Sequence, residues 1–175
     1  MRTALALTLL ALAACSKETK PEMKSAPSLS TPAVAANAVK ADPQVDTADG
    51  ATKHVAGDHF ALDLAAKGCK VGAECTLTIK LAVEGSFHVN KEYPYRFIAT
   101  ETPGVDFLGK GDKTKFTKDS GDFVADGEKA GTMTVRFKPS AAGKTKITGT
   151  YKMSVCSADQ CQIEEPSLDL VIPAS

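Results

Sequence analysis

The sequence predicts an all-β fold, an immunoglobulin-like antiparallel β-sandwich, from three observations. Apolar residues repeat with a period of two in several short runs, which is the pattern of strands with one buried face. Turn signals containing Gly or Pro separate these runs, and no long window carries the apolar stripe of a helix. All aromatic residues lie from Phe60 onward, so the core is expected in that part of the chain.

The alternation is clearest in five runs, each with apolar side chains at every second position and mostly small or polar residues between them. These runs cover residues 60–64, 75–83, 133–137, 147–155 and 168–172. Their spacing predicts seven to nine short strands in residues 52–175, as in a β-sandwich. Residues 102–126 are less regular, and we expect there a long connection over one end of the sandwich.

The charge balance excludes one class of partner. The chain holds 21 basic and 21 acidic side chains among 175 residues. Binding to a phosphate backbone requires a clustered excess of Lys and Arg, so no nucleic-acid partner is expected. The sequence contains no Gly-rich phosphate loop, hydrolase elbow or zinc-protease helix motif, and no cofactor is expected. His54, His59 and His88 lack the spacing of metal ligands, so no metal site is expected.

The N-terminus is similar to a bacterial lipoprotein signal. A basic start and a short apolar run lead into Leu12-Ala13-Ala14-Cys15, which resembles a lipobox. The run is too short to cross a hydrocarbon core of about 30 Å. The resemblance implies that Cys15 is lipidated and anchors the protein to a membrane, whereas an ordinary secretory signal is the alternative. Ser16, rather than an acidic residue, follows the cysteine, and by resemblance to lipoprotein sorting in Gram-negative bacteria this implies the outer membrane, with the protein facing the periplasm.

The chain is therefore divided into three parts. Residues 1–14 are the expected lipoprotein signal peptide, and residues 15–51 are the lipidated cysteine with a flexible linker. The linker is rich in Pro, Ser, Thr, Ala and Lys and has no aromatic residue, so it cannot bury enough apolar surface to fold alone. Residues 52–175 form the expected sandwich domain.

Four further cysteines would then lie outside the cytoplasm, where disulfides persist. They are Cys69, Cys75, Cys156 and Cys161, and three connectivities are possible. Short separations favour the Cys69–Cys75 and Cys156–Cys161 pairs, and their spacing does not suit zinc. Closing so small a loop removes only about 2 kcal/mol of unfolded-state entropy. Both a redox role and a structural role stay open for Cys156–Cys161.

The domain resembles a known family, the N-terminal periplasmic domain of the thiol:disulfide interchange protein DsbD. In that family a late strand leads to one cysteine, and a second cysteine after a turn leads into the last strand. Residues 150–156, 161–166 and 168–173 match this order. Residues 85–96 are similar to a pair of strands in the family, and residues 106–110 are similar to its cap loop. The resemblance spans most of residues 58–173.

The chain also departs from the family. Full-length members continue into a transmembrane electron conduit and a thioredoxin-like domain, whereas this sequence ends at Ser175. Four residues separate the second cysteine pair, where the family often has more. Cys69 and Cys75 have no counterpart in the family.

The resemblance implies thiol–disulfide exchange at Cys156 and Cys161 through a mixed disulfide. We expect Cys161, which follows the exposed turn, to face the partner, and the more sheltered Cys156 to resolve the mixed disulfide. The partner would be a thioredoxin-like or other periplasmic redox protein.

The resemblance also implies roles for three neighbouring residues. Phe107 would cover the pair, Asp106 would handle protons, and Tyr151 would pack beside the pair. Their alternative roles are a loop anchor, a turn residue and a core aromatic residue. Cys69 and Cys75 would form a structural disulfide.

Two functions thus remain open, and the sequence does not decide whether the protein is an enzyme. The first is a lipid-anchored module that exchanges disulfides or relays electrons. The second is a non-catalytic immunoglobulin-like lipoprotein that binds a protein or a component of the cell envelope.

Overall fold

The computed structural model describes residues 39–47 and 49–175. The expected signal peptide, Cys15 and the linker up to residue 38 lie outside the described residues. Within the described part, the chain forms strands, turns and irregular connections. No helix in this part is long and apolar enough to cross a membrane.

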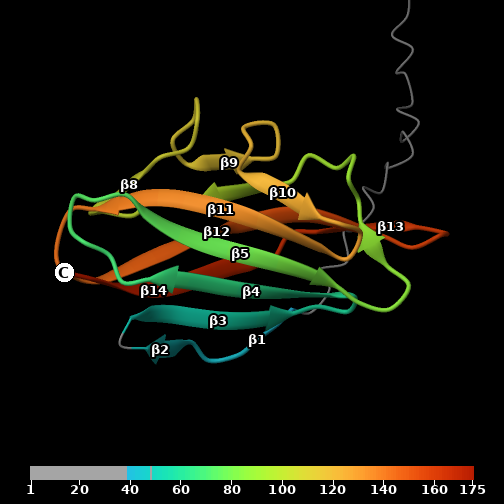
Figure 1. Cartoon of the computed structure of the whole chain (residues 1–175), viewed down its shortest axis with the longest axis horizontal. Helices are drawn as coiled ribbons and strands as arrows, with labels where there is room; N and C mark the ends of the chain where they lie inside the picture. Colours follow the sequence, from blue (N-terminus) through green and yellow to red (C-terminus); the bar gives the residue numbers. More distant parts are fainter. Residues whose placement is uncertain (1–38, 48) are drawn as a thin grey trace, which may run out of the picture. The chain divides into compact units, whose positions relative to one another are not determined.

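Fourteen strands are present in the described part of the chain (Figure 1). In chain order they are β1 (Lys40–Ala41), β2 (Val45–Thr47), β3 (Gly50–Ala56), β4 (Phe60–Lys67), β5 (Cys75–Val83), β6 (His88–Val89), β7 (Arg96–Ala99), β8 (Val105–Phe107), β9 (Lys115–Thr117), β10 (Phe123–Asp126), β11 (Ala130–Pro139), β12 (Gly143–Cys156), β13 (Cys161–Glu164) and β14 (Ser167–Ala174).

The strands form two antiparallel sheets, which confirms the predicted β-sandwich class. One sheet has the order β1-β3-β4-β5-β11-β10, with β2 paired to β3 and β8 paired to β11. The other has the order β13-β12-β7-β9, with β14 and β6 also paired to β12. Paired strands within both sheets are antiparallel throughout.

The core lies between the inner faces of the two sheets, where the alternating apolar side chains meet. In β5, for example, Leu77, Ile79 and Leu81 are almost completely buried, while Thr76 and Lys80 between them are exposed. Such alternation places every second side chain on the same face of a sheet. All five runs predicted from the sequence lie within strands of this kind.

Strand β12 is the longest and changes partners along its length. Its first half pairs with β14, and its middle pairs with β7. Its last residues lie between β13 and β6. Gly149 fits this crowded stretch because a Cβ there would lie 2.4 Å from the Phe97 ring and 2.5 Å from the carbonyl oxygen of Ile98. The end of β12 is therefore held from both sides.

Two sequence expectations need correction. The sandwich begins before residue 52, because β1 and β2 already pair with β3. The Gln44 side chain also bonds to both backbone groups of Val171 on β14, which ties this segment to the second sheet. Residues 102–126 are not one long connection, since they contain the three short strands β8, β9 and β10. Segments this short leave too few alternating positions for a sequence pattern to show.

Candidate functional site

Cys156 and Cys161 form a disulfide where β12 turns back into β13. The two residues occupy directly opposed positions, and their Cα atoms lie 4.0 Å apart. The turn between them is closed by a hydrogen bond from the backbone N–H of Ser157 to the carbonyl of Gln160. In Figure 1 this hairpin extends from one end of the sandwich. The structure thus confirms the pairing that the short separation favoured.

The two cysteines differ in exposure. Cys156 is 5% exposed, whereas Cys161 is an exposed residue at the start of β13. Alternation explains the placement of Cys156, because Met153 and Val155 point into the core and Ser154 and Cys156 point to the opposite face. The exposure order agrees with the expected division into a partner-facing and a sheltered cysteine, whose roles remain a prediction.

The strand that carries Cys156 is fixed by hydrogen bonds just before the cysteine. The Tyr95 hydroxyl and the backbone N–H of Asn90 both donate to the carbonyl of Ser154. The Asn90 side-chain amide donates to the Ser154 hydroxyl at 3.3 Å. These contacts hold the end of β12 against β6 and the segment that follows β6, so the backbone just before Cys156 is fixed by hydrogen bonds.

Two side chains that the sequence did not assign to this site share the face of the pair. His88 on β6 is directly opposite Cys156, on the side away from Cys161. Ile163 lies two residues after Cys161 on β13 and is 55% exposed. Residues at opposed positions, or two apart on one strand, point to the same face of a sheet. The sequence pattern could not reveal His88 as a neighbour, because β6 is only two residues long and its register is set by β12.

The structure does not bring the expected cap residues to the disulfide. Phe107 lies on β8, paired with Phe137 near the end of β11, and its ring contacts that of Phe116. Figure 1 shows β8 and β13 at opposite ends of the long axis of the sandwich. Phe107 is 3% exposed and is a buried core aromatic, so the expectation that it covers the pair is wrong.

The other two auxiliary residues are also placed elsewhere. Asp106 is exposed on β8 and forms an ion pair with Lys113 at 3.1 Å. Because β8 lies at the opposite end of the sandwich from β13, Asp106 is not placed to exchange protons with Cys156 directly. Tyr151 is on the same strand as Cys156, but it lies an odd number of positions before the cysteine, so its side chain is on the other face and points into the core. Its ring contacts Tyr95, and burial raises the pKa of its hydroxyl well above the usual value.

The Cys69–Cys75 disulfide occupies a different setting. Both cysteines are buried, and their Cα atoms are 5.9 Å apart. The backbone of Cys69 also bonds to the second sheet: its N–H donates to Pro173, and its carbonyl accepts from Ser175. The loop between β4 and β5 is therefore tied to the C-terminal strand, which fits the expected structural role.

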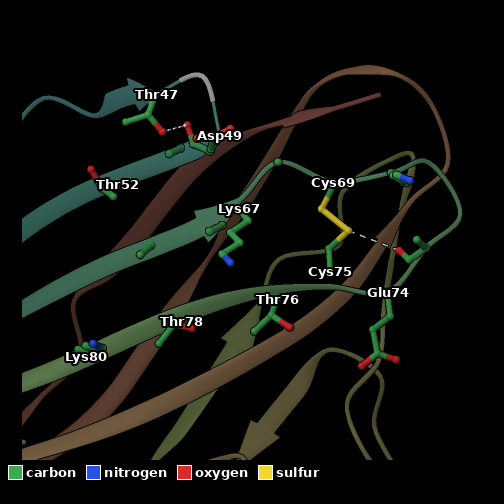
Figure 2. A pocket seen from close by; sticks show the side chains of 17 residues that line it. Thr47, Asp49, Thr52, Lys67, Cys69, Glu74, Cys75, Thr76, Thr78 and Lys80 are labelled. Atoms are coloured by element: carbon green, nitrogen blue, oxygen red, sulfur yellow. Dashed lines mark hydrogen bonds between the residues drawn. A yellow bond between two sulfur atoms is a disulfide. The ribbon is translucent and has the colours of Figure 1, made fainter.

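A hollow of about 800 Å³ lies beside this buried disulfide (Figure 2). It runs over the outer face of β3, β4 and β5, where Thr52, Lys67, Thr76, Thr78 and Lys80 are seen in Figure 2. Asp49 and Glu74 add acidic groups at its margin. Cys156 and Cys161 do not line it, so the hollow and the exposed disulfide are separate features.

The histidines and acidic residues do not suggest a metal site. Over residues 39–47 and 49–175, no group of three His, Cys, Asp or Glu side chains is placed to hold a metal ion. Nδ1 of His54 lies 2.7 Å from Oδ1 of Asp63, and this hydrogen bond raises the pKa of the imidazole. His59 stacks on the ring of Phe87.

Comparisons with known proteins give little beyond this geometry. No family model matches the sequence, and a search of curated proteins finds no match. One similar solved structure is AggA, the major subunit of aggregative adherence fimbriae type I from Escherichia coli. Its TM-score is 0.34 at 9% identity, covering 67% of this chain and 97% of AggA. A likeness at this TM-score carries no argument about function.

Proposed function

We propose that the protein is a thiol–disulfide exchange module that uses the Cys156–Cys161 pair. The observation that carries the proposal is the contrast between the two disulfides. Cys161 is exposed at the base of a protruding hairpin turn, while both sulfurs of the other disulfide belong to buried residues. An incoming thiolate must reach a disulfide sulfur, and exposed disulfides have higher reduction potentials than buried structural ones.

The two cysteines take different roles in this proposal. A thiolate of the partner attacks the exposed Cys161 and forms a mixed disulfide, which releases Cys156. In the reverse direction, Cys156 attacks Cys161 and resolves the mixed disulfide. Ile163, exposed beside Cys161, supplies apolar contact area for a partner that carries its own cysteine pair. A thioredoxin-like or other periplasmic redox protein fits this requirement.

We further propose that Cys15 is lipidated and holds this module at the membrane, facing the periplasm. The support is the lipobox-like sequence before Cys15 and Ser16 after it, which favours the outer membrane. A Cys15→Ser variant should be released from the membrane fraction. Continued membrane association of that variant would contradict lipidation at this residue.

The exchange activity is tested by measuring the reduction potential of each disulfide separately. The protein is equilibrated in a series of thiol redox buffers, alkylated, and analysed by mass spectrometry of the two cysteine-containing peptides. We expect the Cys156–Cys161 potential to lie well above about −300 mV, and the Cys69–Cys75 potential to lie below that of the first pair. In a Cys156→Ser variant, Cys161 should trap a mixed disulfide with the partner. Equal resistance of both pairs to reduction, with no trapped complex, would overturn the proposal.

The hollow on the outer face of β3, β4 and β5 favours the second candidate, a non-catalytic binding protein. Its threonine and lysine side chains offer hydrogen-bond donors to a polar ligand. A Cys156→Ser/Cys161→Ser double variant separates the two candidates because it removes the exchange chemistry and leaves the hollow unchanged. If this variant complements a deletion strain, so that the wild-type phenotype returns, binding is the function. If it does not, while a Lys67→Ala/Lys80→Ala variant does, exchange is the function.

A further inference from the structure

His88 is the cross-strand neighbour of Cys156, the sheltered cysteine of the exposed disulfide. His88 and Cys156 occupy directly opposed positions of β6 and β12. The backbone N–H of Asn90 donates to the carbonyl of Ser154, so residues 90 and 154 are a hydrogen-bonded pair of the ladder. Hydrogen-bonded and non-hydrogen-bonded pairs alternate along an antiparallel ladder, so residues 88 and 156, two positions further along, are again a hydrogen-bonded pair. Their Cα atoms are therefore about 5.5 Å apart, with both side chains on one face of the sheet.

The three residues form a row across three strands. His88, Cys156 and Cys161 lie on β6, β12 and β13, and Cys156 is the central member. His88 is exposed and is not needed to fill the core, whereas its neighbour Val89 is 1% exposed. The row thus places an imidazole, which can donate or accept a proton, directly across the sheet from the buried Cys156.

We propose that His88 supplies the proton that Cys156 needs when the disulfide is reduced, and removes it when the disulfide re-forms. This inference rests on the proposed exchange function and names the acid–base group of the same site. Cys156 is the leaving sulfur of the exchange, and a leaving thiolate departs faster when a cation or proton donor stabilises it. Cys161 is exposed to solvent and can exchange protons with water directly.

Each step of the reduction balances with a dithiol as the reductant. A donor thiolate attacks Sγ of Cys161, and the bond between the two cysteine sulfurs breaks. Cys156 leaves with the electron pair and takes the proton from the His88 imidazolium, which regains a proton from solvent. The second donor thiol loses its proton to solvent and attacks the first donor sulfur, which releases Cys161 as a thiolate. Two electrons pass from the donor, which becomes a disulfide, to the cysteine pair.

Other charged groups lie on the elements around His88, and they bear on any pH dependence. Lys91 follows β6, and the carbonyl of Glu128 accepts a hydrogen bond from the N–H of Val89. The Lys129 ammonium donates to the carbonyls of Gly85 and Phe87, next to His88. Lys152 on β12 is paired with Glu165 at 2.7 Å, and Asp159 lies in the hairpin turn. Of the side chains named here, only that of His88 is an imidazole, and this is the group that the test below replaces.

The test compares His88→Asn with the unchanged protein, using dithiothreitol as the reductant. The rate of reduction of Cys156–Cys161 is measured between pH 5.5 and 8.5 by alkylation and mass spectrometry. The concentration of the dithiothreitol thiolate is calculated at each pH, so that the rates refer to the attacking species. We expect His88→Asn to reduce the rate at pH 6 about tenfold and to remove the residual pH dependence. His54→Asn is the matched control because His54 is exposed on β3 and hydrogen bonded to Asp63.

A second measurement uses the thiol itself. In a Cys161→Ser background, the pH at which alkylation of Cys156 is half-maximal should rise by at least one unit when His88 becomes Asn. His88→Lys should keep the lower midpoint, because it retains a cation. Unchanged rates and midpoints in His88→Asn would overturn the role of His88. If the pair in the unchanged protein also fails to equilibrate with the thiol redox buffers, the exchange function itself fails.

Discussion

The hydroxyl of Tyr95 donates a hydrogen bond to the backbone carbonyl of Ser154, two residues before Cys156. Tyr95 is completely buried, and its ring stacks on Phe123 with ring centroids 4.0 Å apart. This bond joins the aromatic core to the strand end that carries the exposed disulfide. Tyr151 is equally buried, but its hydroxyl has no hydrogen-bond partner among the described residues.

Replacing each tyrosine by Phe should therefore change the free energy of unfolding in opposite directions. Tyr95→Phe should lower the free energy of unfolding by about 1 kcal/mol, because the Ser154 carbonyl keeps only its bond from Asn90. Tyr151→Phe should leave stability unchanged or raise it by up to about 1 kcal/mol, since it removes a buried hydroxyl without a partner. Urea unfolding of both variants measures the difference. A larger loss for Tyr151→Phe would contradict this assignment.

Stability should also fall at high pH because of Tyr95. Burial raises the pKa of its hydroxyl to about 12, whereas the unfolded chain releases this proton near pH 10. Above pH 10 the unfolded state thus binds fewer protons than the folded state, and the free energy of unfolding decreases. The contribution is fully present below pH 10 and is lost as the pH rises to 12. A shift of this size corresponds to at most about 3 kcal/mol.

Urea unfolding between pH 9 and 12 measures this loss. Tyr95→Phe is the control and should show a shallower decline over the same range. The decline that remains in that variant comes partly from Tyr151, whose pKa is also raised by burial. An identical pH profile in both proteins would show that Tyr95 does not contribute.

The sequence predicts the strands that are long enough to show alternation. The runs within β4, β5, β11, β12 and β14 each cover several alternating positions, so their apolar faces could be recognised. Strands β1, β2 and β6 are two or three residues long and owe their conformation to pairing with a neighbour. Because such pairing is a long-range property, no local pattern indicates where these strands begin.

The candidate site was predictable only in its covalent part. The short separation of Cys156 and Cys161 and the turn between them predicted both the disulfide and the exposure of Cys161. Phe107 and Asp106 were assigned to the site by resemblance, and the register of β8 with β11 places them at the other end of the sandwich. For His88 the reverse holds. Nothing in the sequence distinguishes it from an ordinary strand residue, and only its pairing with Cys156 in the structure places it at the site.

A buried ion pair should contribute more to stability than an exposed one. The carboxylate of Asp122, which is 4% exposed, accepts hydrogen bonds from Arg136 at 2.8 Å and from the backbone N–H of Thr117 at 3.0 Å. Asp122→Ala should lower the free energy of unfolding by about 3 kcal/mol, because the Arg136 charge loses its partner. Asp106→Ala, which breaks the exposed pair with Lys113, should cost less than about 0.5 kcal/mol.

Urea unfolding of the two aspartate variants checks this contrast. Asp106→Ala should also leave the reduction rate of Cys156–Cys161 unchanged, since β8 lies at the other end of the sandwich. A slower reduction in Asp106→Ala would restore the proton-handling role that the structure does not support. Equal losses of stability in both variants would show that burial does not distinguish the two pairs.

The buried Cys69–Cys75 disulfide should contribute more to stability than the exposed Cys156–Cys161 disulfide, although the exposed disulfide should react more readily with thiols. Both close loops of similar length, for which the chain-entropy estimate is about 2 kcal/mol each. Replacing Cys69 and Cys75 by Ser also buries two hydroxyls and loosens the segment that bonds to Pro173 and Ser175. We therefore expect a loss of about 4 kcal/mol for that double variant and about 2 kcal/mol for Cys156→Ser/Cys161→Ser.

Unfolding in urea without reductant gives the two values, and hydrogen exchange at the amides of Cys69 and Ser175 locates the effect. Exchange at these amides should accelerate only in the Cys69→Ser/Cys75→Ser variant. A disulfide at the exposed end of a hairpin, whose loss costs less stability than that of the buried disulfide, is better explained by the chemistry of its sulfur atoms than by the fold. If the exposed pair proves to contribute as much stability as the buried pair, a structural role is sufficient to explain it.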